Sequence, residues 1–511
     1  MMRRLLPLLV FGLPLFVAAQ ERPNILFILA DDMGWQDTSV AFGPERTPFN
    51  DRYRTPGLER LADEGVRFTQ SYSCAVCSPT RVSFLTGQNV TRHGVTQWTY
   101  LSGDAPSSDL PHPTLSSAPW NWNGLQPEPG LPRSVSVTTL PELLNQAGYR
   151  TMHFGKGHLG ASGTPGADPK VFGFDIRMGG RDGGGCGSYW GTKHFGALRN
   201  PDKPWRAWDL DAYFGQDIHL TEALTLEAKK AIRQSVAADE PFFCYFAHFA
   251  PHTPIEPDER FAPRYREEGL DDVEAAYASL IEGMDKSVAD LLALLDELEI
   301  ADETLIVFTS DNGGLSHSRR SMGKPHTHNA PLSSGKGAHH EGGIRVPTLV
   351  RWPGVAPAGS VESTPVIIED WFPTLLSVAN QPLPQSHKID GRDLGPLLDG
   401  DGVIEEQPLI WHFPNSWGPL QLPGPVEGPG MGPSSAIRMG AWKLVYYYSD
   451  QRFELFNLAD DLGETKNLAS SHPEKTRDLG EALSRTLRER NAPMPILKAT
   501  GQPVPWPDES L

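Results

Sequence analysis

Charged and polar side chains follow four short apolar runs that are predicted to be buried strands. They stand where each run ends, at Asp31-Asp32, at Lys156 and His158, at His252, and at Asp311-Asn312. In open parallel sheets, ligands bind at the carboxyl ends of the strands. Each of these groups taken alone is commonly a helix cap, a solvated turn or a structural hydrogen-bonding residue. Because four separate segments deliver them to one edge, the sequence indicates a polar reaction site there.

The oxygen-bearing members of this set predict a hard metal cation. Carboxylate and amide oxygens are the ligands that Ca²⁺ and Mg²⁺ prefer. A two-zinc hydrolytic site would need several histidine ligands, and the second acidic motif, Asp311-Asn312, supplies an amide instead. One hard cation is therefore the better interpretation.

Alternating strands and helices are predicted around these groups. The predicted strands are 24–30, 151–154, 241–249 and 304–309, and the predicted helices are 55–65, 221–238 and 271–300. Short apolar runs with abrupt ends are typical of buried strands. The alternation predicts an α/β fold with a large, mostly parallel sheet between helices on both faces. Two stretches rich in Pro and Gly, 102–133 and 158–205, interrupt the pattern as long insertions.

The pattern changes beyond about residue 400. Residues 436–448 and 453–458 are predicted to be antiparallel strands around a polar turn, and 474–490 a last helix. We therefore expect a catalytic domain over residues 20–400 and a smaller C-terminal α+β subdomain over 401–511.

Residues 1–19 predict a secretory signal peptide. Arg3 and Arg4 precede an apolar run over 5–17, and the small residues Ala18 and Ala19 follow it. A membrane anchor is the alternative, but the run is too short to span a bilayer, and no later stretch reaches about 20 apolar residues. We expect an exported protein, periplasmic or secreted, with no stable membrane insertion.

Composition limits the partners. The 511 residues carry 45 Lys and Arg against 63 Asp and Glu, a formal net charge of −18. Nucleic-acid binding needs clustered basic residues, so no such partner is expected, and any anion site must be built locally. Four cysteines in so long a chain do not form a disulfide framework.

Cys74 and Cys77 have the spacing of a zinc or thioredoxin motif, but the context fits neither. A zinc site needs two further Cys or His ligands at suitable spacing, and Cys186 and Cys244 stand alone. A thioredoxin-like pair would open a helix in a small βαβ domain, which this long chain is not.

The segment Cys77-Ser-Pro-Thr-Arg81, followed by Thr86-Gly87, resembles the signature of the formylglycine-dependent (type I) sulfatases of the alkaline-phosphatase-like superfamily. The resemblance covers nearly the whole mature chain in ordered motifs, among them RPNILFILADDMGWQD, TPGLERLADEGVRF, GKGHLG, APHTP, SDNGG, GKGAHHEGGIRVP and FELFNLADDLGETKNL. One departure is Gly157, where the family usually has Trp or Tyr.

The resemblance implies a modified nucleophile at Cys77. In this family a dedicated maturation enzyme oxidises the signature cysteine to formylglycine, whose hydrate attacks sulfur and later releases sulfate as the aldehyde reforms. The resemblance also implies one divalent cation, Ca²⁺ with Mg²⁺ as the alternative, which orients and polarises the sulfate. Its implied ligands are Asp31, Asp32, Asp311, Asn312 and the nucleophile at position 77.

The remaining implied roles belong to five side chains. Arg81 steadies the hydrated nucleophile, and His158 forms a hydrogen bond with it. Lys156 and Lys336 clamp the sulfate oxygens. His252 protonates the leaving oxygen, alone or together with a lysine.

The resemblance implies a sulfuric ester hydrolase acting on a sulfated glycan or saccharide. Aromatic residues in or beside the insertions would stack on sugar rings or lie buried under the loops, namely Trp98, Tyr100, Trp120, Trp122, Tyr189 and Trp190. Two alternatives remain: a phosphate or phosphonate ester hydrolase of the same superfamily, and a non-catalytic carbohydrate-binding descendant of a sulfatase. The second would predict loss of a key group, and all of those named above are present.

Overall fold

The computed structural model describes residues 22–198, 205–316, 327, 329–400, 402–418 and 426–511. Nine strands in this part form one large sheet in the order β10-β2-β8-β7-β1-β6-β4-β5, with β9 beside β2. Their bounds are β1 Asn24–Ala30, β2 Val66–Tyr72, β4 Arg150–Gly155, β5 Ile176–Gly179, β6 Phe242–Ala247, β7 Thr304–Ser310, β8 Arg345–Arg351, β9 Ser360–Glu362 and β10 Val366–Ile367.

The large sheet is mostly parallel, as the sequence predicts. β1 is parallel to both of its neighbours, β6 and β7, and β4 is parallel to β5 and β6. Only β8 runs antiparallel to its neighbours, β2 and β7, within the described residues. The carboxyl ends of β1, β4, β6 and β7 therefore meet at one edge of the sheet.

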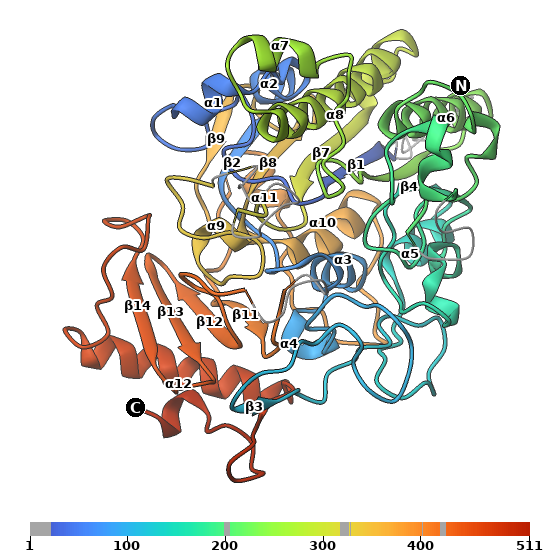
Figure 1. Ribbon diagram of the computed structural model, residues 1–511. Helices are drawn as coiled ribbons and strands as arrows, with labels where there is room; N and C mark the ends of the chain where they lie inside the picture. The colour runs from blue at the N-terminus through green and yellow to red at the C-terminus, as the bar shows by residue number, and fades with distance from the viewer. Residues whose placement is uncertain (1–21, 199–204, 317–326, 328, 401, 419–425) are drawn as a thin grey trace, which may run out of the picture.

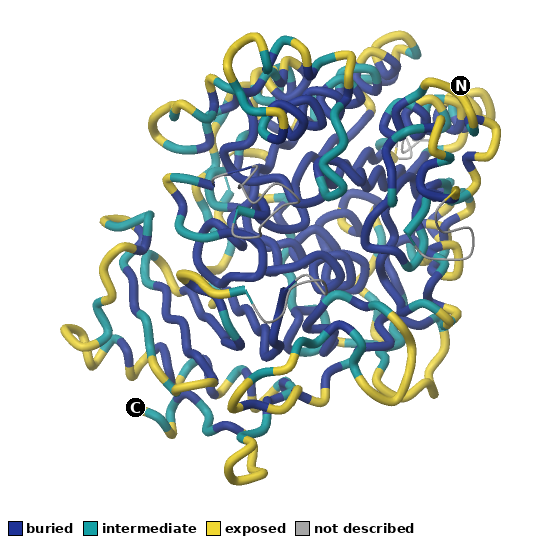
Figure 2. Tube along the Cα trace, viewed as in Figure 1, coloured by how far each residue is buried: buried dark blue, intermediate teal, exposed yellow. Residues whose placement is uncertain are grey.

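Helices cover both faces of this sheet (Figure 1). On one face lie α2 (Pro56–Glu64), α6 (Leu220–Ala237), α7 (Ala262–Glu267) and α8 (Asp272–Glu297), and on the other lie α3 (Cys77–Thr86), α5 (Leu140–Gln146) and α10 (Trp371–Val378). The alternation of side chains along β1 explains the two layers. On one face, Phe27 stacks on Phe84 of α3. On the other face, Leu26 and Ile28 lie in the hydrophobic core that contains Met284 of α8. Figure 2 shows the buried sheet between exposed outer turns.

A smaller antiparallel sheet with one helix forms the C-terminal part, drawn in orange and red in Figure 1. Its strands are β11 Leu409–Phe413, β12 Ser434–Met439, β13 Trp442–Tyr447 and β14 Phe453–Asn457, and its helix is α12 Pro473–Glu489. The prediction of a single strand over 436–448 was wrong. Gly440 has φ +56 and turns the chain between β12 and β13, which pair as a hairpin.

Shorter elements complete the described chain. The helices are α1 Pro48–Arg52, α4 Val90–His93, α9 Glu341–Ile344 and α11 Gly395–Leu398, and a two-stranded pair joins β3 Leu115–Ser116 to β15 Ile496–Leu497. Short 3₁₀ turns occupy Pro165–Ala167, Pro169–Phe172, Gly191–Gly196, Asp211–Tyr213, Ala301–Glu303, Ile368–Asp370 and Pro507–Glu509.

The two predicted insertions differ in what they build. The second one supplies β5, so part of it is an edge strand of the large sheet rather than a loop. Trp120, Trp122 and Tyr189 are buried, which settles their place under the loops. The predicted signal segment, 1–19, lies outside the described residues. No helix of the described chain is long and apolar enough to cross a bilayer.

Candidate active site

Cys77 is the first residue of α3, directly after the loop that follows β2. Thr80, in the first turn of this helix, donates a hydrogen bond to the Asp311 carbonyl at 2.6 Å and accepts one from the Cys74 amide at 2.9 Å. These contacts fix the helix N-terminus against the end of β7. The partial positive charge of a helix N-terminus favours an anionic nucleophile at this position.

Three buried cations pair with three buried carboxylates beside Cys77. Arg81 Nε and Nη2 donate to Asp311 Oδ2 at 3.0 and 2.7 Å. Lys156 Nζ donates to both oxygens of Asp31 at 2.8 and 2.7 Å. Lys336 Nζ lies 2.5 Å from Asp32 Oδ1 and 3.3 Å from Cys77 Sγ. Six residues singled out from the sequence thus lie around the same cysteine.

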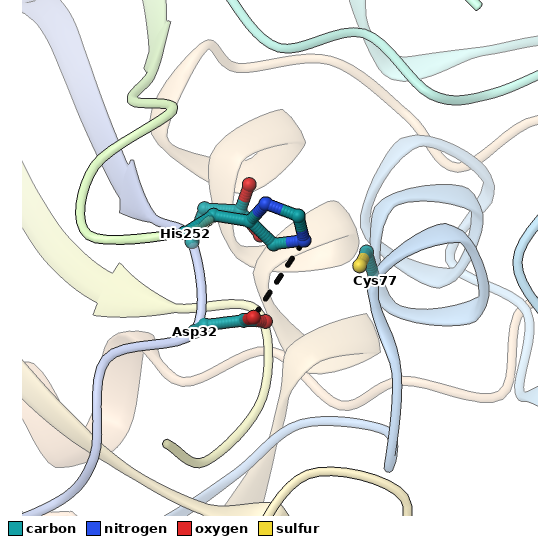
Figure 3. A group of neighbouring side chains, drawn as sticks. Asp32, Cys77 and His252 are labelled. Atoms are coloured by element: carbon teal, nitrogen blue, oxygen red, sulfur yellow. Dashed lines mark ion pairs between the residues drawn. The ribbon is translucent and has the colours of Figure 1, made fainter. Parts of the chain in front are cut away.

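His252 faces the same carboxylate from the other side (Figure 3). Its Nε2 is 3.6 Å from Asp32 Oδ2, and its Nδ1 donates to the Thr253 carbonyl at 2.7 Å. With Nδ1 holding the proton, Nε2 of the neutral ring is an acceptor. Lys336 therefore bonds Asp32 Oδ1, whereas Asp32 Oδ2 faces His252 without a hydrogen bond.

His158 completes the set of predicted residues. Its Nε2 donates to the Thr99 carbonyl at 2.9 Å, and its Nδ1 has no hydrogen-bond partner among the described residues. The ring is covered by Gly184, where an added Cβ would lie 2.8 Å from Cε1. Nδ1 is therefore a free acceptor on a ring that lines the same hollow as Cys77.

Burial sets the protonation of these groups. It raises the pKa of the Cys77 thiol, although Lys156 and Lys336 oppose the shift. It lowers the pKa of His252 to about 3, against the opposing effect of Asp32, and lowers that of His158 well below its usual range. Burial alone would raise the pKa of Asp32, but the Lys336 ammonium group holds it below its ordinary value. Both histidines are thus neutral at neutral pH.

The oxygen atoms left without partners fit a hard cation. Asp32 Oδ2 and Asn312 Oδ1 are buried and accept no hydrogen bond from the described residues. Ligand atoms of Asp31, Asp32, Cys77 and His252 lie within 4.8 Å of one another. The sequence analysis places His252 at the same sheet edge as the cation ligands but assigns it to the leaving oxygen rather than to the cation. Such an oxygen-rich set with orphaned acceptors is what Ca²⁺ or Mg²⁺ would satisfy.

A hollow of about 210 Å³ opens above Cys77. Besides His158, His252 and Lys336, it is lined by Trp98, Trp205, Leu315 and Trp417. The Trp417 ring lies on Gly337, where φ is +92 and an added Cβ would come within 2.4 Å of the ring. Sequence reasoning singled out Trp98 but missed Trp205 and Trp417, since no spacing links them to the motif residues.

The chain is similar to known sulfatases over most of its length. A family model described as Sulfatase matches residues 23–381, and a second, described as N-sulphoglucosamine sulphohydrolase, C-terminal, matches 335–492. A sulfatase of Formosa agariphila is 29% identical over 99% of this chain and 98% of its own. The N-acetylgalactosamine-6-sulfatase of Rattus norvegicus is 34% identical over 81% of this chain and 72% of its own.

The chain also resembles a solved structure over most of its length. The crystal structure of Ps i-CgsB superposes with a TM-score of 0.72 at 26% identity, covering 92% of this chain and 94% of that chain. A match over residues 23–381, more than two thirds of the chain, includes β1, the Cys77 helix and β7, which together carry most of the groups described above. The chain therefore belongs to the sulfatase family and is a sulfuric ester hydrolase.

Proposed function

We propose that the enzyme removes sulfate from a sulfated carbohydrate, with a formylglycine derived from Cys77 as nucleophile and one divalent cation. One observation carries the proposal: Cys77 begins a buried helix, with Lys336 Nζ 3.3 Å from its sulfur and the ligand atoms of two aspartates and His252 within 4.8 Å. Because burial raises the thiol pKa, the unmodified cysteine is a poor thiolate nucleophile.

The cation is assigned to Asp31, Asp32, Asp311, Asn312 and the oxygen of modified residue 77. When bound, it would act as a Lewis acid and template for the sulfate group. The orphaned oxygens of Asp32 and Asn312 support this ligand set. Ca²⁺ is preferred over Mg²⁺ because the set offers several carboxylates and an amide oxygen, the large all-oxygen ligand set that Ca²⁺ takes.

The groups around residue 77 are placed to hold its hydroxyls and the sulfate. A hydrated formylglycine would supply two hydroxyls, one to attack sulfur and one whose loss of a proton drives sulfate release. Arg81 is fixed by Asp311 and by the Lys156 carbonyl, at 2.9 Å, so its guanidinium is an immobile positive charge beside the nucleophile. Nδ1 of His158 would accept a hydrogen bond from one hydroxyl.

Lys156 and Lys336 are the proposed clamps on the sulfate oxygens. Each ammonium group now contacts an aspartate that belongs to the proposed cation ligands. A divalent cation on those carboxylates would leave the two ammonium groups for the substrate anion. The leaving oxygen would receive its proton from the pair of His252 and Lys336, which share Asp32.

The carbohydrate assignment is supported by the walls of the hollow and by the relatives. Trp98, Trp205 and Trp417 offer the flat aromatic faces on which sugar rings stack. Ps i-CgsB has been solved in complex with k-i-k-neocarrahexaose, and several mammalian relatives, that of Rattus norvegicus among them, are N-acetylgalactosamine-6-sulfatases. We further propose export through the 1–19 segment and a formylglycine-generating enzyme as maturation partner.

The test is sulfate release by protein co-expressed with the maturation enzyme. Defined sulfated saccharides, starting with 6-sulfated N-acetylgalactosamine, are compared with an aryl sulfate and an aryl phosphate. The proposal predicts release from at least one saccharide and a higher kcat/KM on the aryl sulfate than on the phosphate. A preference for phosphate would favour the phosphohydrolase alternative, and no hydrolysis of any ester would favour the binding-protein alternative.

The same protein tests the cation. Chelation should abolish turnover, and added Ca²⁺ or Mg²⁺, but not Zn²⁺, should restore it. Two metal ions per chain in an anomalous-scattering map would contradict the single-cation site.

A further inference from the structure

A cavity of about 630 Å³ lies between the edge of the large sheet and the C-terminal sheet. It shares no lining residue with the hollow above Cys77. Its walls come from β2 through Gln70, from β8 through Arg345 and from β12 through Arg438, and Arg392 adds a third guanidinium. The chain as a whole is acidic, with a net charge of −18, whereas three positively charged arginines line this one cavity.

Arg438 has no carboxylate partner among the described residues, although it is only 4% exposed. Its Nε donates to the Gly440 carbonyl at 2.9 Å, Nη1 donates to the Tyr72 hydroxyl, and Nη2 donates to Gln70 Oε1. All three acceptors are neutral. By contrast, Arg345 pairs with Glu341 at 3.1 Å, and Arg392 pairs with Asp370 at 2.9 Å.

The surrounding buried charges do not compensate Arg438. The Tyr72 hydroxyl donates a hydrogen bond to Glu341 at 2.7 Å, but Glu341 already pairs with Arg345 and Lys443. Lys443 also contacts Glu464 at 2.6 Å. Three cations, Arg345, Arg438 and Lys443, therefore share two carboxylates. A buried charge without a counter-charge is costly, so an anion from outside would stabilise this cluster.

The two buried guanidiniums retain donors for such an anion. A guanidinium carries five N–H groups, and the contacts above engage three on Arg438. Arg345 also donates one N–H from each nitrogen: Nε and Nη2 donate to the Thr69 carbonyl, and Nη1 donates to Glu341. Both lie over aromatic rings, with Arg438 Cζ 5.2 Å from the Tyr72 centroid and Arg345 Cζ 4.6 Å from that of Trp35. Glu406, the acidic residue of the lining, is exposed at the rim.

We propose that this cavity is a second anion site, which binds an oxyanion group, sulfate or carboxylate, between Arg438 and Arg345. Guanidinium groups match the paired oxygens of such anions. The volume exceeds that of a single anion, since a water molecule occupies roughly 30 Å³. The site therefore has room for the sugar that carries the group as well as for the free ion.

The test is the stoichiometry of sulfate binding to the matured enzyme by isothermal titration calorimetry. The wild-type chain should bind two sulfates, one at each site. Lys336→Ala should lose the site above Cys77 and keep the second, whereas Arg438→Met should lose the second and keep the first. Wild-type binding of a single sulfate that Lys336→Ala abolishes, or unchanged two-site binding by Arg438→Met, would overturn the proposal.

A second measurement keeps the proposal testable if Arg438→Met does not fold. Wild-type crystals soaked in selenate should show a selenium anomalous peak beside the Arg438 guanidinium, and absence of that peak would overturn the site. Separate titrations with a sulfated oligosaccharide and with its unsulfated counterpart then show whether the site binds a sulfated glycan or the free ion. Arg438-dependent binding at least tenfold tighter than that of inorganic sulfate indicates the glycan, and equal affinity indicates the free ion. Sulfatase turnover tests the proposed function separately, because Arg438 does not contact the reacting groups.

Discussion

Asp32 lies between two groups that could deliver a proton to the leaving oxygen. Lys336 Nζ contacts one carboxylate oxygen at 2.5 Å, and His252 Nε2 lies 3.6 Å from the other. Burial holds His252 neutral, with a pKa of about 3, so Nε2 is an acceptor in the resting site. Lys336 is the cation on the same carboxylate, so the proton donor that we propose is the pair of side chains rather than His252 alone.

Removal of His252 should depend on the leaving group. A sugar alkoxide needs a proton in the transition state and a nitrophenolate does not, and general acid catalysis contributes on the order of 10²-fold or more. His252→Ala should therefore lower kcat on a sulfated sugar by about 10²-fold, but by less than about tenfold on nitrophenyl sulfate. Parallel kcat measurements on the two substrates check this. Equal losses on both would remove His252 from proton transfer.

At the residue scale, the predictable part of the site is the part fixed by motifs. Asp31, Asp32, Asp311 and Asn312 follow buried strands, and the sheet brings strand ends together, so their meeting could be predicted. The three-tryptophan wall could not, because Trp205 and Trp417 come from distant loops. The Trp417 ring packs directly on Gly337, which has no side chain, and no local sequence pattern predicts this contact.

At the scale of elements, the strands with continuous apolar runs were predicted well. β1 occupies the predicted range and β7 extends it by one residue, since both are buried on both faces. Strand direction could not be predicted in the same way: β8 is antiparallel to β2 and β7 but is as fully buried as β7, so its apolar sequence does not show its direction. The hairpin of β12 and β13 was missed because apolar residues flank Gly440 on both sides.

Glu369 links several elements and should make stability depend on pH. It lies in the Ile368–Asp370 turn and accepts from Asn89, which caps α4 and also donates to the Ile410 carbonyl of β11. Burial raises the pKa of Glu369 to about 8, and its Oε2 has no partner among the described residues. A carboxyl whose folded pKa is raised stabilises the fold at low pH and loses that contribution as pH rises from about 4.5 to 8.

Glu369→Gln removes this titration while keeping the shape of the protonated side chain. Relative to the variant, the wild-type free energy of unfolding should fall by up to about 4 kcal/mol between pH 4.5 and 8. Urea unfolding of both proteins across this range measures the difference. A difference that does not change with pH would show that Glu369 is ionised in the folded protein.

At the scale of the whole molecule, buried ion pairs join the C-terminal sheet to the catalytic loop. Lys443 of β13 contacts Glu341 of α9 at 2.8 Å and Glu464 at 2.6 Å. His340 Nε2 contacts Glu454 of β14 at 2.9 Å. Lys336 is five residues before Glu341, and the C-terminal family model begins at Gly335. The domain boundary that we predict near residue 400 leaves the Lys336 loop in the catalytic domain, although His340 and Glu341 in that segment pair with residues beyond the boundary.

Lys443→Met should therefore impair both stability and catalysis. It leaves Glu464 without its lysine and Glu341 with Arg345 alone, which costs about 3–5 kcal/mol, and it loosens the loop that carries Lys336. Urea unfolding and kcat on an aryl sulfate measure the two effects, with Lys466→Met, an exposed lysine of the same part of the chain, as control. Full activity in a destabilised Lys443→Met protein would show that the C-terminal sheet does not position the loop.

The central claim is that modified Cys77 both attacks sulfur and releases sulfate, and the direct measurement is sulfate released per chain. The Cys77→Ser hydroxyl can attack once but offers no second hydroxyl for release. Matured wild type and Cys74→Ser, which alters only the buried neighbour thiol, should turn over many times. Cys77→Ser should stop after at most one equivalent, with sulfate esterified to the introduced serine in the peptide mass spectrum. Sustained turnover by Cys77→Ser would contradict the account.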